Sequence, residues 1–126
     1  MMRRLVRAAV RNATVTRAEG VTVKLDPLIL TAANILPLEE VEVVNHATGE
    51  RVTTFAEAGA SGEVCAPRMR AGDVVSVLSW GTMHDGQTLN HTAKLVTVDA
   101  SNRVVAVSET EAGSSEFLGV PRSPSG

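Results

Sequence analysis

The chain has 126 residues, a formal net charge of −2 and very few aromatic side chains, with no tyrosine. Its length fits one domain, its charge excludes a general attraction to nucleic acid or anionic membranes, and the scarcity of aromatic rings excludes a base-stacking surface. No apolar run is long enough to span a membrane, and the single cysteine, Cys65, favours a reducing cytoplasm.

Short β-prone runs recur along most of the chain, separated by turn residues. Many of them alternate apolar and polar side chains, which is typical of strands with one buried face. In chain order they are residues 5–10, 13–18, 21–25, a hairpin over 41–57, then 63–66, 74–80, 94–98 and 103–107. Seven or eight short strands predict a mainly β fold, and we expect them to close into a small barrel because closure removes exposed edges.

One short helix interrupts the strands. Asp26 followed by Pro27 is typical of a helix start, and Asn34 is typical of a helix end. Residues 26–34 are therefore expected to form a helix that is buried on most sides. Residues 81–91 predict a loop, and residues 108–126 a polar tail whose apolar segment 117–120 is a candidate anchor.

Several short motifs follow one another in a fixed order over residues 1–107. They are residues 12–18, 23–26, 30–36, 41–44, 48–55, 71–75 and 82–83. Their order and spacing resemble the pyruvoyl-dependent aspartate 1-decarboxylases. The resemblance implies a double-psi β-barrel, a homotetramer with active sites between neighbouring subunits, and a small substrate that carries a carboxylate. The composition, rich in alanine, valine and arginine, suits a bacterium with GC-rich DNA.

Members of that family cut their own chain at a Gly-Ser bond and convert the serine into a pyruvoyl group, the electron sink for decarboxylation. Val21 and Thr22 stand at the matching positions. Valine resists the strained backbone that glycine tolerates, and cutting before threonine would give an oxobutanoyl group instead of pyruvoyl. The sequence therefore predicts that this bond stays intact and that the protein has no cofactor.

Other family positions carry over one at a time. Arg51 matches the arginine that grips the substrate carboxylate, and Thr54 the threonine that assists processing. Phe55 stands in place of a tyrosine that donates a proton, while Ala9 and Arg11 replace a lysine and a histidine of the family site. Arg51, Arg11 and Phe55 are thus candidate substrate-binding residues, and Arg51, Thr22 and Thr54 candidate catalytic ones. Each arginine and threonine can equally be an ordinary strand residue.

The three histidines do not have the spacing of a compact metal motif, so no metal site is predicted. His84 and His91 lie in the same predicted loop and are possible acid–base groups, because imidazole titrates near neutral pH.

Three functions remain open on the sequence. The first is a repurposed decarboxylase-like barrel without a pyruvoyl group, acting on a small anionic metabolite as a cofactor-free cyclase or lyase in biosynthesis. The second is an aspartate 1-decarboxylase-like enzyme that processes itself between Val21 and Thr22. The third is a non-catalytic ligand-binding or assembly subunit. The first is the main prediction.

Overall fold

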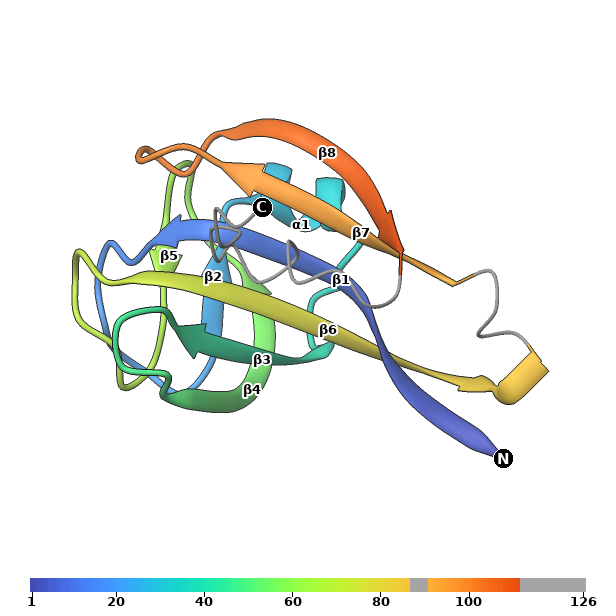
Figure 1. Ribbon diagram of the computed structural model, residues 1–126. Helices are drawn as coiled ribbons and strands as arrows, with labels where there is room; N and C mark the ends of the chain where they lie inside the picture. Colours follow the sequence, from blue (N-terminus) through green and yellow to red (C-terminus); the bar gives the residue numbers. More distant parts are fainter. Residues whose placement is uncertain (87–90, 112–126) are drawn as a thin grey trace, which may run out of the picture.

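The computed structural model describes residues 1–86 and 91–111, which form a curled β-sheet and one α-helix (Figure 1). The elements are β1 (Met2–Thr14), β2 (Val23–Leu25), α1 (Pro27–Ala33), β3 (Glu40–Asn45), β4 (Arg51–Ala58), β5 (Val64–Cys65), β6 (Val74–His84), β7 (Thr92–Val98) and β8 (Val104–Glu111). The strands lie in the order β5-β2-β4-β3-β6-β1-β7-β8. This curled sheet confirms the predicted mainly β fold, a small β-barrel.

Small aliphatic side chains fill the interior of the barrel. The strands β3 and β4 alternate between exposed and buried residues along their length, as the sequence pattern predicts. Val10, Val43, Val77 and Leu25 are among the fully buried residues that pack into one core. Because most of these side chains are β-branched and stiff, they favour the strand conformation and pack tightly without aromatic rings.

The first strand, β1, lies in the middle of the sheet. It pairs antiparallel with β6 along most of its length and parallel with β7 over Ala8–Arg11. The predicted break at residues 11–12 is a β-bulge within this one strand, where Asn12 adopts a positive φ of 65°. Asparagine tolerates that conformation, so the chain bends there without ending the strand.

The helix α1 begins and ends as predicted. The Asp26 carboxylate accepts a hydrogen bond from the Leu28 backbone N–H at 2.8 Å and another from the Gly62 N–H at 2.8 Å. Asn34 ends the helix in the left-handed conformation. The buried face is narrower than expected, since Leu28 is 71 % exposed.

Some strands begin or end at other residues than predicted, because pairing with a neighbouring strand sets their limits. β2 begins only at Val23, because the preceding residues have no ladder with β4. β6 continues to His84, into the predicted loop, because β1 extends beside it. The segment 117–120 lies outside the described residues. Among the described helical residues, no helix is long and apolar enough to cross a membrane.

Candidate active site around residues 21 and 22

An exposed loop carries Val21 and Thr22, and both of its ends are fixed to the barrel. Before the loop, the Thr16 N–H donates to the Val64 carbonyl at 2.8 Å, and the backbones of Arg17 and Cys65 form an isolated parallel β-bridge. After the loop, Val23 enters β2 and pairs with Ala56 of β4. The bond between residues 21 and 22 is therefore presented at the surface by a short segment that is fixed on both sides.

The carbonyl oxygen of Val21 is held by a buried hydroxyl. Thr54 Oγ1 donates a hydrogen bond to it in a short contact, and Thr54 is only 6 % exposed. Thr54 lies on the inward face of β4, between the buried residues Val52 and Ala56. A donor aimed at this oxygen would stabilise the negative charge that develops on it during nucleophilic attack on the carbonyl carbon.

The hydroxyl of Thr22 has a different partner on the same strand. Thr22 Oγ1 donates to Glu57 Oε2 at 2.7 Å. Glu57 was not singled out from the sequence. The alternation of β4 places it on the side of Arg51 and Phe55, but the parallel pairing of β2 with β4, which brings it to Thr22, is not visible in a single sequence.

The backbone strain expected at residue 21 lies one residue earlier. Gly20 adopts a φ of +74°, and no heavy atom lies within 4 Å of where its Cβ would be. Val21 is absent from the described residues with positive φ, and its side chain is 82 % exposed. The residue of this loop with a left-handed backbone is thus a glycine, which tolerates it, and Val21 does not carry that strain.

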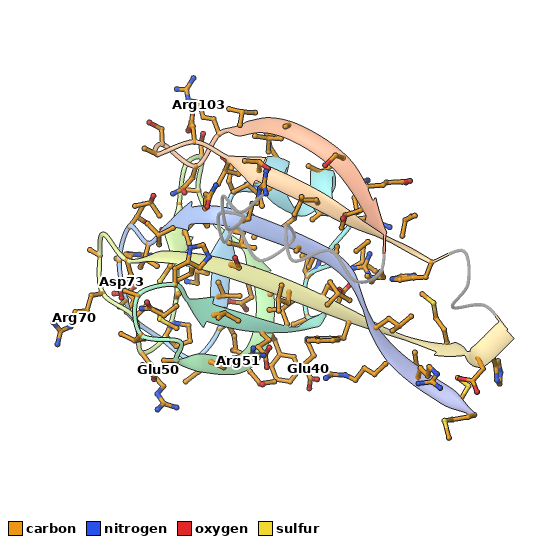
Figure 2. The ribbon with its side chains drawn as sticks, viewed as in Figure 1. Glu40, Glu50, Arg51, Arg70, Asp73 and Arg103 are labelled. Atoms are coloured by element: carbon orange, nitrogen blue, oxygen red, sulfur yellow. The ribbon has the colours of Figure 1, made fainter. Side chains whose placement is uncertain are left out.

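Arg51 begins β4 and projects from the surface of the barrel (Figure 2). The preceding turn is fixed by Asn45, whose side-chain oxygen accepts hydrogen bonds from the N–H groups of Ala47 and Thr48. The guanidinium forms an ion pair with Glu42 at 2.9 Å across the β3–β4 ladder. This pair is more than half exposed on the arginine side, so a carboxylate ligand can compete for Arg51 at little cost.

Arg11 and Arg51 do not lie in the same site within one chain. Its Nε donates to Thr97 Oγ1 at 2.8 Å, on β7, and the strands β3 and β6 separate β1 from β4. Measured along the curled sheet, three strand spacings, or about 14 Å, lie between the two backbones. Ala9 is fully buried.

Phe55 lies between Arg51 and Glu57 on the outward side of β4 and is 51 % exposed. It provides an apolar surface on the same side of β4 as Glu57, which contacts Thr22. A phenyl ring has no acidic proton, so any proton transfer near this position requires another group.

The histidines lie on other parts of the sheet. His91 Nε2 contacts the Val6 carbonyl at 2.6 Å, and His84 is opposite Met2 at the end of β6. His46 contacts Ser76 Oγ at 2.7 Å, and burial lowers the pKa of His46. The acid–base role of His84 and His91 stays a prediction. Among the described residues, no three histidine, cysteine or acidic side chains gather as they would around a metal ion.

A polar network crosses from β1 to β6 on a different part of the sheet. Arg7 Nη2 donates to Glu39 Oε2 at 2.7 Å and to Ser79 Oγ at 2.9 Å, and the Ser79 hydroxyl also contacts Glu39. Burial acts to raise the pKa of Glu39, but the hydrogen bonds from Ser79, Arg7 and the Leu36 N–H, with the positive charge of Arg7, outweigh it and hold this pKa below its usual value.

Comparison with known proteins decides the family. A family model described as aspartate decarboxylase matches residues 1–105, which is most of the chain. The chain belongs to the aspartate decarboxylase family.

Curated relatives with this activity are similar over nearly their whole length. The aspartate 1-decarboxylase of Listeria monocytogenes (strain EGD-e) is 33% identical over 82% of this chain and 90% of the relative. That of Shouchella clausii is 32% identical over 90% of this chain and 98% of the relative. That of Dehalococcoides mccartyi (strain 195) is 36% identical over 82% of this chain and 91% of the relative. The resemblance read from the motifs is therefore confirmed.

Two predictions from the sequence are wrong on this evidence. The relatives are named aspartate 1-decarboxylase, which supports decarboxylation over a repurposed cyclase or other lyase. The expectation of no cofactor conflicts with a family whose members depend on pyruvoyl. Both predictions relied in part on strain expected at Val21, whereas the positive φ in this loop is at Gly20.

The residues around the loop fit a keto acyl group made from Thr22. A donor contacts the carbonyl oxygen of residue 21, and an acceptor contacts the hydroxyl of residue 22. These are the two atoms that an internal acyl transfer would engage. Threonine instead of serine at this position implies a ketone that is larger by one methylene group.

Proposed function

We propose that the protein is an amino-acid decarboxylase that acts on aspartate or a close acidic analogue and makes its own electrophile from Thr22. The observation that carries the proposal is the hydrogen bond from Thr54 to the carbonyl oxygen of Val21. The activity of the relatives supports the substrate class.

The self-processing reaction uses only groups of this chain and water. Thr22 Oγ1 attacks the carbonyl carbon of Val21, the bond from that carbon to the Thr22 nitrogen breaks, and an ester with a free amine remains. Loss of the Thr22 α-proton expels Val21 as a carboxylate. Hydrolysis then releases ammonia and leaves a 2-oxobutanoyl group at residue 22. Thr54 supports the first step by donating to the developing oxyanion.

The ketone, when present, supplies an electron sink for loss of carbon dioxide from an amino acid. Arg51 is proposed to bind the substrate carboxylate, since a guanidinium fork recognises a carboxylate with two parallel hydrogen bonds. The substrate carboxylate would displace Glu42 from Arg51, because the partly exposed ion pair between these two residues is weak. Phe55 is proposed to cover the substrate and exclude water, while Arg11 can contribute only from a neighbouring subunit or by a large side-chain movement.

The decisive experiment is mass spectrometry of the purified, denatured chain. We expect fragments of residues 1–21 and 22–126, whose summed mass equals that of the intact chain plus one water minus one ammonia. Thr22→Ala is expected to stay intact, and Thr22→Ser to yield a second fragment lighter by one methylene. Release of carbon dioxide from L-aspartate is then compared between Thr22→Ala and the processed protein. A chain that remains whole after prolonged incubation contradicts the proposal.

We also infer that the enzyme works as a homo-oligomer in the cytoplasm. Support for assembly comes from large apolar side chains that are exposed around α1, namely Leu28, Leu36 and Leu38. Support for the compartment comes from Cys65, which is free and buried. Light scattering coupled to gel filtration measures the oligomeric state, and a monomer at micromolar concentration contradicts the first inference.

A further inference from the structure

We propose that Glu57 is the general base that activates Thr22 for self-processing. The inference rests on the proposed function and assigns a catalytic residue to its first step. Glu57 contacts the reacting atom directly, because its Oε2 accepts the hydrogen bond of Thr22 Oγ1 at 2.7 Å.

The surroundings of Glu57 favour a base over an ion-pair partner. Within residues 1–86 and 91–111, the ion pairs involve other carboxylates, and the side chain of Glu57 forms a hydrogen bond with Thr22. Lys24 is its register neighbour on β2, but the two side chains form no ion pair in this described part of the chain. The carboxylate thus contacts the hydroxyl and, among the described residues, forms no ion pair with a cation.

Threonine needs such a base more than serine does. A hydroxyl is a weak nucleophile at neutral pH, and proteins activate it with an adjacent group that takes its proton. The extra methyl group of Thr22 adds crowding at the attacking oxygen and restricts its rotamers. A hydrogen bond to Glu57 fixes the rotamer and provides the acceptor for the proton at the same time.

The two residues of β4 act on different atoms of the same peptide. Thr54, on the inward face, donates to the carbonyl oxygen of Val21, while Glu57, further along the strand, accepts from the hydroxyl of Thr22. This separation matches the two charges that change during attack. One group stabilises the oxygen that becomes negative, and the other removes the proton that the attacking oxygen must lose.

The proposed step is balanced without any added reagent. The Thr22 Oγ1 proton passes to Glu57 as the bond from Oγ1 to the Val21 carbonyl carbon forms. The bond from that carbon to the Thr22 nitrogen then breaks, and the nitrogen takes the proton back from Glu57. The products are an ester between residues 21 and 22, a free amine at Thr22, and the original carboxylate of Glu57.

The test separates the base from a mere hydrogen-bond acceptor. In Glu57→Gln the amide oxygen still accepts the hydrogen bond of Thr22 but takes no proton, whereas Glu57→Ala loses both functions. We expect both variants to process about 10²- to 10⁴-fold more slowly than the natural chain, the usual contribution of a positioned base. Glu57→Asp keeps a carboxylate and is expected to lie between the natural chain and Glu57→Gln. Glu40→Gln, an exposed carboxylate on β3, is the matched control and is expected to process normally.

Hydroxylamine identifies the step that Glu57 serves. It cleaves an ester but not an ordinary peptide bond, so it releases fragments from any chain in which the acyl transfer has occurred. We expect hydroxylamine to accelerate fragmentation of a partly processed natural chain and to leave Glu57→Gln intact.

Each outcome decides the matter. Glu57→Gln that processes as fast as the natural chain, with Glu57→Ala slow, means that Glu57 only fastens the loop, and overturns the proposal. Rapid release of fragments from Glu57→Gln by hydroxylamine means that the ester forms without the Glu57 carboxylate. Any role of Glu57 then lies in a later step, and this result also overturns the proposal. A natural chain that never fragments refutes the proposed function itself, which is a different result from natural processing that is independent of Glu57.

Discussion

Thr54→Val isolates the contribution of one hydroxyl to self-processing. Valine keeps the shape and β-branching of threonine but cannot donate to the Val21 carbonyl oxygen. Removing one donor of this kind from an oxyanion site lowers the rate by about 10²- to 10³-fold, or about 2.7–4 kcal/mol in the activation barrier. We expect that loss in the rate at which the purified precursor fragments.

The stability of the variant should change little. Thr54 is almost fully buried, so the added methyl group of valine remains among apolar neighbours. Water can replace the lost donor, because the Val21 residue is largely exposed. The net worth of one such hydrogen bond is about 1 kcal/mol, which bounds the change in the free energy of unfolding.

The assay follows the fraction of intact chain with time by denaturing gel or mass spectrometry, starting from freshly purified precursor. Urea unfolding of Thr54→Val in the Thr22→Ala background measures stability without interference from processing. Thr54→Ser, which keeps the hydroxyl, is the control and should process within about tenfold of the natural rate, as expected for a donor that is kept but less constrained. A Thr54→Val precursor that fragments at the natural rate refutes the role of this donor.

Three further predictions concern binding and stability. Arg51→Lys should raise the KM for L-aspartate by about 10- to 100-fold with a smaller change in kcat, because lysine lacks the bidentate fork; steady-state kinetics measure it, and an unchanged KM contradicts the assignment. Asp26→Ala should lower the free energy of unfolding by about 2–4 kcal/mol, because the N–H groups of Leu28 and Gly62 both lose their acceptor. Urea unfolding measures this change, and a decrease of less than about 1 kcal/mol contradicts the prediction. The Glu39 carboxylate should stabilise the fold above its usual pKa of about 4.5 and lose that contribution as the pH falls through its lower folded pKa; the stability difference between the natural chain and Glu39→Gln should therefore shrink in acid, and a constant difference contradicts it.

Local signals predicted the local structure well. The helix was found from Asp26, Pro27 and Asn34, because capping depends on residues that are close in sequence. The break expected at residues 11–12 became a bulge, since the hydrogen bonds from β6 and β7 hold both halves of β1 in one strand. Pairing between distant strands overrode a weak local signal.

The site was predicted only in part. Thr22 and Thr54 were found through the family motifs, and the structure brings both to the same peptide bond. Glu57 was missed because its contact with Thr22 joins residues on two parallel strands, and parallel pairing leaves no pattern in one sequence. The positive φ of Gly20 was also missed, because the strained backbone was expected at Val21.

The central place of β1 has a consequence for the proposed maturation of the enzyme. If the chain is cut after Val21, as proposed, residues 1–21 become a separate peptide. That peptide stays in the molecule through the ladders of β1 with β6 and β7, through its buried side chains, and through non-covalent contacts such as the hydrogen bond from Thr16 to Val64. Recovery after denaturation then becomes a meeting of two chains and depends on their concentration, whereas the uncut precursor refolds on its own. We expect cleaved protein that is unfolded and strongly diluted to regain little structure. Efficient folding would therefore take place in the uncut precursor, before cleavage.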